Sequence, residues 1–195
     1  DPVGIRFKRF VDLVFGILAF TILAPLLLTV ALVVRFSSPG RVLYKQERVG
    51  LGGKVFTLYK FRSMVQDAER LGPQWSELND PRVTTVGRFL RASRIDELPQ
   101  LWNLIVGNMS LIGPRPERPE FVSELKKEIP FYDVRELAVP GLTGWAQVKY
   151  PYGSSVKDSY RKLEYDLYYI KNHSVRLDIT IFFKTLMVVL KGSGR

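Results

Sequence analysis

The chain has 195 residues, no cysteine and a single histidine, which excludes disulfides, thiolate metal sites and sites built from several histidines. Its length suits one domain, or one domain with a membrane segment, and a hydrophobic share of 46% is ordinary for a folded protein. With 29 basic against 19 acidic residues the net charge is +10, so we expect an anionic partner: nucleic acid, an anionic bilayer or phosphorylated substrates. Any bound metal would have oxygen ligands, which suits Mg²⁺ better than Zn²⁺.

An uncharged apolar run, LVFGILAFTILAPLLLTVALVV, extends from Leu13 to Val34 and is long enough to span a hydrocarbon core. Pro25 lies near its middle, where a proline removes one helix hydrogen bond and bends or breaks the helix. Basic residues flank the run on both sides, so the rule that positive charge marks the cytoplasmic side selects neither end. These features favour a re-entrant membrane helix over residues 1–36, broken at Pro25, over a kinked helix that spans the bilayer.

The next segments predict a small β-hairpin. Residues 41–50 and 54–64 are rich in β-branched and aromatic side chains, and the GLGG sequence of Gly50–Gly53 lies between their cores. After the hairpin, residues 64–72 are predicted to form a short helix that ends at Gly72. Residues 72–87 read as a loop.

Two adjacent carboxylates, Asp96 and Glu97, precede an apolar run with helical spacing that ends at Gly107. One interpretation is structural, because aspartate is a favoured N-cap residue and glutamate in the first turn suits the helix dipole. The other interpretation is a reaction centre. On this stretch alone the structural interpretation is favoured, and the rest of the chain has to decide.

The C-terminal half alternates between predicted loops and helices. Residues 109–121 and 139–153 are rich in proline and glycine and are expected to be loops, whereas residues 119–129 and 154–173 are expected to be helices. In the second helix, Ser155 and Asp158 have the spacing of a capping box, and Val156, Tyr160, Leu163, Leu167 and Ile170 share one face.

The C-terminal run, residues 175–192, is apolar with sparse charges. Two interpretations remain open for it: an amphipathic helix that lies in the membrane interface, or a buried core helix. The chain as a whole predicts an α+β, mainly helical protein with a small β-hairpin and several short helices. We expect residues 37–195 to form one cytoplasmic domain with interfacial helices, and the chain to be compatible with part of a longer protein.

Five motifs in this order carry a resemblance to a known family: KRFVDLVFG, YKFRSM, NDPRVTTVGRFLRASRIDELPQLWN, MSLIGPRPE and PGLTGWAQV. Together they resemble the monotopic phosphoglycosyl transferases, also called bacterial sugar transferases or polyprenyl-phosphate sugar-1-phosphate transferases. The resemblance covers nearly the whole chain, and the tail after residue 150 is similar to the exopolysaccharide-type members.

The resemblance implies an activity. Members transfer a sugar-1-phosphate from a UDP-sugar to undecaprenyl phosphate, release UMP and require Mg²⁺. The reaction is the first membrane step of exopolysaccharide or other surface-glycan assembly, on the cytoplasmic face of the bacterial inner membrane. Membrane lipid would therefore be a partner and nucleic acid would not.

The resemblance also assigns roles to residues. It makes Asp96 the nucleophile of a covalent phosphosugar intermediate, with Glu97 beside it, and both become candidate Mg²⁺ ligands. Three basic residues are expected to bind substrate phosphate: Lys60, Arg91 and Arg115. Arginine suits this role because its planar fork donates two hydrogen bonds to phosphate oxygens.

Other residues receive weaker expectations. Trp145 and Gln147 could contact the uridine, while Trp102 is expected to pack in the core or at an interface. Three more arginines are expected at the surface, in solvent or against lipid headgroups: Arg62, Arg88 and Arg94.

Alternatives remain at this stage. The chain could be a non-catalytic basic module that binds anionic lipid, although such a module needs no carboxylate pair. In a third interpretation both substrates bind together, and Asp96 only holds metal or acts as a base. The identity of the sugar (glucose and galactose by analogy), the separate roles of Glu97 and the oligomeric state, including a homodimer, stay open.

Overall fold

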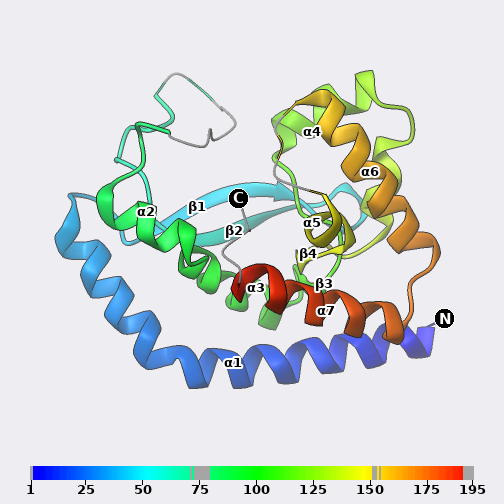
Figure 1. The fold of residues 1–195 in the computed structure, drawn as a ribbon, viewed down its shortest axis with the longest axis horizontal. Coiled ribbons are helices and arrows are strands. Elements are labelled where there is room, and N and C mark those ends of the chain that lie inside the picture. The colour runs from blue at the N-terminus through cyan, green and yellow to red at the C-terminus, as the bar shows by residue number, and fades with distance from the viewer. Residues whose placement is uncertain (1, 71, 73–79, 151–152, 154, 191–195) are drawn as a thin grey trace. The chain divides into compact units, whose positions relative to one another are not determined.

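The computed structural model describes residues 2–70, 72, 80–150, 153 and 155–190 (Figure 1). The chain forms two compact units. Unit 1 comprises residues 1–46 and 58–107, and unit 2 comprises residues 47–57 and 108–195. The protein is mainly helical, as the sequence predicted, and it contains two small sheets, of which the sequence predicted one.

The apolar N-terminal run forms α1, a helix from Pro2 to Ser37. Among the helices of the described residues, α1 alone contains a segment, Gly4–Ser37, that is long and apolar enough to cross a membrane. Figure 1 shows that α1 bends along its length, but the helix continues through Pro25 and is not broken there. Pro25 cannot donate to the carbonyl four residues before it, and this missing bond permits the bend.

The predicted hairpin is present. Strand β1 (Leu43–Val49) pairs with β2 (Val55–Phe61), and the turn between them includes the single 3₁₀ turn η1 (Leu51–Gly53). Gly52 and Gly53 have φ values of 63° and 75°, in the left-handed region that glycine adopts most easily. The turn sequence therefore explains where the strands reverse.

The segment after the hairpin differs from its prediction. Residues 66–70 form turns instead of the expected helix, and Met64 makes an isolated antiparallel bridge to Val83. A helix that the sequence analysis missed, α2, runs from Thr85 to Ala92. Thr84 caps it, since its hydroxyl accepts from the backbone N–H of Gly87 at 2.9 Å.

Helix α2 packs directly on the end of the hairpin. A side chain at Gly87 would place its Cβ 1.9 Å from the carbonyl oxygen of Ser63, so only glycine allows this approach. Downstream of α2 follow the 3₁₀ helix η2 (Ile95–Gln100) and the short α3 (Leu101–Val106). Gly107, with φ of 98°, ends α3 as predicted.

Two arginines tie α1 into unit 1. Arg9 donates to the carbonyls of Leu104 and Ile105 at 2.6 and 2.5 Å, which satisfies carbonyls at the C-terminal end of α3. Arg62 is buried rather than at the surface, which corrects the expectation made for it. Its guanidinium donates to several oxygens around the end of α1: the carbonyls of Val34, Ser38 and Arg41, and the Ser38 hydroxyl.

Unit 2 contains a second, parallel two-stranded sheet that the sequence analysis missed. Strand β3 (Ser110–Ile112) pairs with β4 (Gly141–Thr143), and α5 (Trp145–Lys149) follows at once. Both strands, and α5, lie in segments expected to be loops. Strands of three residues are too short to give a readable alternation, and their pairing depends on glycines that admit close backbone contact.

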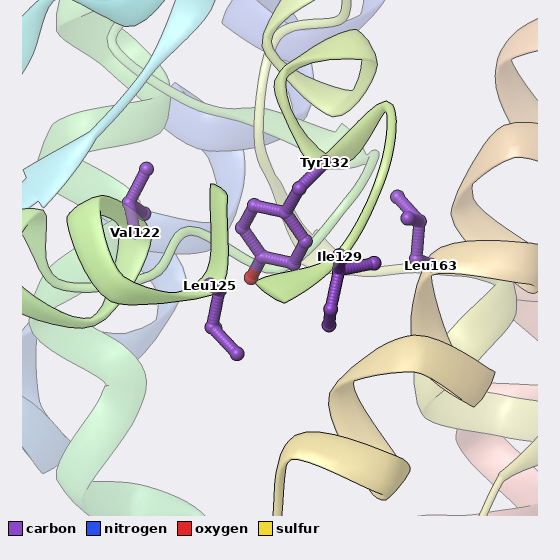
Figure 2. Close-up of a cluster of buried hydrophobic side chains, with 5 residues drawn as sticks. All are labelled: Val122, Leu125, Ile129, Tyr132 and Leu163. Atoms are coloured by element: carbon purple, nitrogen blue, oxygen red, sulfur yellow. The ribbon is translucent and has the colours of Figure 1, made fainter. Parts of the chain in front are cut away.

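The predicted helices of unit 2 are present as α4 (Pro119–Glu128) and α6 (Val156–Lys171), with the 3₁₀ helix η3 (Tyr132–Leu137) between them. The capping box of Ser155 and Asp158 is confirmed. Figure 2 shows the apolar cluster that joins α4, η3 and α6. Its buried members are Val122, Leu125, Ile129, Tyr132 and Leu163.

The predicted apolar face of α6 is only partly buried. Leu163 lies in the core, but Val156 and Tyr160 are exposed, and the buried side includes Asp166 and Tyr169 instead. The last helix, α7 (Val175–Leu190), buries Ile181 completely. Its exposed apolar side chains recur at helical spacing: Val175, Ile179, Phe183, Leu186 and Met187.

Candidate active site

The carboxylate pair lies in η2, not at the start of an α-helix. The residue before η2 is Arg94, whose φ of 59° reverses the chain, and no side chain caps the element. The expectation that Asp96 serves as an N-cap is therefore wrong. The bend at Arg94 and the 3₁₀ geometry direct Asp96 into unit 1, where 6% of the residue is exposed.

Asp96 is buried without a full set of hydrogen bonds. Its Oδ1 accepts none from the residues that the structure describes. Burial raises the pKa of Asp96 above its ordinary value, and the negative charge of Glu97 raises it further. The positive charges of Lys60, Arg91 and Arg94 act in the opposite direction. Asp96 is thus a desolvated carboxylate with cations nearby and with an unsatisfied lone pair, which suits a nucleophile.

Glu97 has close cationic partners. Lys60 Nζ lies 2.8 Å from its Oε1, and Arg94 Nη1 lies 3.8 Å from the same atom. Lys60 comes from β2 and Arg91 from the last turn of α2, so three elements bring the charged groups together. The structure thus assembles four of the predicted residues in unit 1: Lys60, Arg91, Asp96 and Glu97.

A hydrogen bond to a buried amide side chain fixes β2 relative to the segment that carries the Asp96–Glu97 pair, called the dyad below. The backbone N–H of Tyr59 donates to Oδ1 of Asn103 at 3.2 Å, and Asn103 is completely buried. Tyr59 precedes Lys60 and Asn103 lies in α3, so this bond fixes the lysine-bearing strand relative to the helix that follows the dyad. The sequence analysis overlooked Asn103, and it assigned Arg94 to the surface although Arg94 stands two positions from Asp96.

The remaining predicted site residues belong to unit 2. Arg115 is half-buried between Pro114 and Pro116, which are both buried. A hollow of unit 2 is lined in part by this Pro-Arg-Pro segment and by side chains of η3, among them Tyr132 and Arg135. The geometry of unit 2 leaves Arg115 as a candidate anion ligand at the edge of a concave surface.

Trp145 and Gln147 have packing partners in unit 2. The Trp145 ring stacks on Tyr168 with centroids 6.1 Å apart, and Lys149 lies 4.9 Å from the Trp145 centroid. Gln147 donates from Nε2 to the carbonyl of Leu142 at 3.2 Å. These contacts give both residues a structural role, and their contact with a nucleotide stays a prediction.

The dyad also provides a donor set for a hard cation. Among the described residues, no three histidine, cysteine or acidic side chains gather into a metal cluster. Mg²⁺ needs fewer, because it commonly takes one or two carboxylates and completes its shell with water and substrate phosphates. Asp96 and Glu97, with the unbonded Oδ1 of Asp96, fit that requirement.

Comparison with known proteins decides the family. The model of the family described as bacterial sugar transferase matches residues 3–192. The chain belongs to the bacterial sugar transferase family. Nearly the whole described structure falls inside the match, including the dyad, Lys60 and Arg115.

Individual bacterial sugar transferases are similar to the chain over most of its length. It is 46% identical over 194 residues to the UDP-N-acetylgalactosamine-undecaprenyl-phosphate N-acetylgalactosaminephosphotransferase of Aeromonas hydrophila, covering all of this chain and 46% of that protein. It is 41% identical over 188 residues to the UDP-glucose:undecaprenyl-phosphate glucose-1-phosphate transferase of Escherichia coli, covering 95% of this chain and 40% of that protein.

A shorter relative matches along nearly its full length. The exopolysaccharide production protein PSS of Rhizobium leguminosarum bv. phaseoli is 38% identical over 194 residues, covering 96% of this chain and 97% of that protein. By contrast, the chain spans less than half the length of the Aeromonas and Escherichia relatives.

Proposed function

We propose that this bacterial sugar transferase moves a sugar-1-phosphate from a UDP-sugar to undecaprenyl phosphate, giving undecaprenyl-diphosphate-sugar and UMP. The names of the Aeromonas and Escherichia relatives describe transfers of this kind. The observation that carries the proposal is the state of Asp96: a buried carboxylate whose Oδ1 lacks a hydrogen-bond donor among the described residues, beside three cations and a second carboxylate.

In the first step, a carboxylate oxygen of Asp96 attacks the sugar-bearing phosphorus of the UDP-sugar. A bond forms between this oxygen and phosphorus, the bond to the bridging oxygen breaks, and UMP leaves with that electron pair. In the second step, a phosphate oxygen of undecaprenyl phosphate attacks the same phosphorus, and the Asp96 carboxylate leaves. Atoms and charges balance without an oxidant or reductant.

The other residues of the site stabilise charge and position the reacting groups. Lys60, 2.8 Å from Glu97, holds this carboxylate beside Asp96 and contributes positive charge toward a bound phosphate. Arg91 and Arg115 are proposed as further phosphate ligands. Mg²⁺, held by Asp96 and Glu97, would supply Lewis-acid neutralisation of the phosphate charge.

A covalent route is distinguishable from direct transfer. The protein is incubated with UDP-sugar and Mg²⁺ in the absence of undecaprenyl phosphate, the reaction is quenched rapidly, and the intact mass of the protein is measured. A sugar-phosphate adduct on Asp96, absent in Asp96→Asn, is expected. Sequential kinetics without an adduct would favour direct transfer. If no UDP-sugar gave UMP, the alternative of a non-catalytic basic module that binds anionic lipid would be favoured.

The sugar is proposed from the relatives. Two that are 46% and 48% identical are named for N-acetylgalactosamine, and several at 37–42% for glucose. We therefore propose UDP-N-acetylgalactosamine as the first donor to test and UDP-glucose as the second, in place of galactose. UMP release measured across a panel of UDP-sugars gives the answer directly.

For the membrane, we propose that α1 enters and leaves by the cytoplasmic face of the inner membrane and that α7 lies in the interface. The basic flanks of α1, its bend and the exposed apolar side chains of α7 support this placement. Because the chain has no cysteine, single cysteines in Lys8→Cys and Arg41→Cys report cleanly. Both should be protected from a periplasmic reagent; labelling of one alone would indicate a spanning helix.

A further inference from the structure

The backbone around Arg115 is fixed by a series of hydrogen bonds. Four successive carbonyl oxygens, those of residues 114–117, each accept a hydrogen bond within unit 2. The N–H of Gly141 donates to the carbonyl of Pro114 at 2.9 Å, and Arg135 Nη2 donates to that of Arg115 at 2.9 Å. Arg48 Nη1 donates to the carbonyl of Pro116 at 3.0 Å, and the N–H of Val49 donates to that of Glu117 at 2.9 Å. These donors come from β4, η3 and β1.

The prolines add a covalent restriction to these bonds. Pro114 and Pro116 have fixed φ angles, and Pro116 confines the backbone of Arg115 toward the extended region. With its carbonyl bonded and both neighbours restricted, the backbone of Arg115 has little conformational freedom. A guanidinium that must meet phosphate oxygens in a planar fork gains from such preorganisation.

Arg135 is itself rigidly held. Its side chain is 10% exposed, and the Nη2 that donates to Arg115 also donates to Oδ2 of Asp166 at 2.9 Å. Its Nη1 donates to the hydroxyl of Tyr132 at 2.6 Å, and its guanidinium carbon lies 5.0 Å from the centroid of that ring. Tyr132 is anchored in the apolar cluster of Figure 2, so the chain of contacts runs from the core of unit 2 to the carbonyl of Arg115.

Stability alone is a poor reason for this arrangement. A buried ion pair seldom stabilises a fold more than well-packed apolar side chains of the same volume, because both charges lose their hydration. What the pair of Arg135 and Asp166 supplies, and apolar side chains cannot, is a directed hydrogen bond to one carbonyl. Arg48, paired with Glu117 at 3.5 Å, gives the next carbonyl a second such bond.

We propose that Arg48 and Arg135 are positioning residues that act through Arg115. They orient the Arg115 guanidinium toward the phosphate groups of the sugar-nucleotide substrate. This inference rests on the proposed function, since it requires Arg115 to bind substrate phosphate. Neither arginine need touch the substrate.

A double-mutant cycle on kcat/KM for UMP release tests the coupling. Arg135→Met should lower kcat/KM by roughly tenfold or more in the natural chain, and by much less once Arg115→Lys has removed the planar fork. Arg48→Met should give the same pattern at smaller size. A charge-conserving surface change, Arg161→Lys, is the control and should leave kcat/KM unchanged.

Folding is separated from positioning by the double variant Arg135→Met with Asp166→Leu, which removes both buried charges together. We expect a thermal unfolding temperature near that of the natural chain, with kcat/KM as low as in Arg135→Met alone. Recovery of activity together with stability would overturn the positioning role, as would additive effects of Arg135→Met and Arg115→Lys. If Arg115→Lys has no effect at all, the proposed role of Arg115 in binding fails, and the inference with it.

Discussion

Asp96 in unit 1 and Asp166 in unit 2 are both buried, but their surroundings differ. Asp166 in unit 2 accepts a hydrogen bond from Arg135 at 2.9 Å. Asp96 in unit 1 is 6% exposed, and its Oδ1 accepts no hydrogen bond from the described residues. Burial raises the pKa of both carboxyls, that of Asp166 to about 6.

The difference distinguishes a carboxylate that holds structure from one that is available for chemistry. A lone pair already used by a buried guanidinium cannot attack phosphorus without breaking that bond. A lone pair that burial has stripped of water, and that no described donor occupies, keeps its nucleophilicity. Burial and charge alone therefore do not separate Asp96 from Asp166, and we propose Asp96 as the reactive aspartate because of its hydrogen-bond partners.

The largest expected effect is that of Asp96→Asn on activity. The amide keeps the size of the side chain, but its uncharged oxygen is a far weaker nucleophile than a carboxylate, so UMP release should fall by roughly a thousandfold or more. Stability should not fall with it. Because the folded-state pKa of Asp96 is raised, the ionised group costs stability at neutral pH, and the neutral amide removes that cost.

The readouts are UMP release and the thermal unfolding temperature in detergent, with the exposed Asp133→Asn as control for loss of one negative charge. A large drop in unfolding temperature for Asp96→Asn would mean that Asp96 is structural, like Asp166.

Asp166→Leu should lower stability instead. Leucine removes both the negative charge and the oxygen that accepts the hydrogen bond from Arg135, so the buried Arg135 is left with an uncompensated charge, at a cost of about 3 kcal/mol of unfolding free energy. Thermal unfolding in detergent measures this loss. An unchanged unfolding temperature would contradict the structural role assigned to the pair.

The pH dependence of kcat/KM should report Asp96. Activity requires the ionised carboxylate, so kcat/KM falls as the pH drops through the pKa of Asp96, which is raised above 3.8. Lys60→Met removes a charge that lowers this pKa, and the acid limb of the profile should move to higher pH. Glu97→Gln should move it to lower pH in whatever activity remains. Shifts in the opposite directions would show that another group controls the limb.

The smallest effect is expected at the start of α6. Ser155→Ala removes the hydroxyl that accepts from the N–H of Asp158, at a cost of about 1 kcal/mol. The hydrogen bonds from Ser155 lower the pKa of Asp158 to about 2, so this contribution is present above pH 4 and is lost as the pH falls toward 2. The measurement is the free energy of unfolding of Ser155→Ala and of the natural chain at pH 7 and at pH 3. If the variant lost the same free energy of unfolding at both pH values, the capping box would be contradicted.

Local patterns were enough to predict several elements. The apolar run of α1, the glycine turn of the hairpin, and the helices α4 and α6 all follow from periodicity and capping within a few residues. The candidate site residues came from motifs, and four of them do meet in unit 1. The same patterns failed for residues 64–72, where turns and a bridge to Val83 replace the expected helix.

The sequence by itself determined the family, the carboxylate pair and the long helices, because these depend on residue types at short spacing. Only the tertiary structure decided the burial of Asp96, the pairing of β3 with β4, and the roles of Arg62 and Arg135. Each of these depends on partners 20 or more positions away, such as Arg115 and Asp166 for Arg135. Hydropathy and periodicity carry no information about which distant carbonyl a guanidinium will meet, since that choice is made when the elements pack.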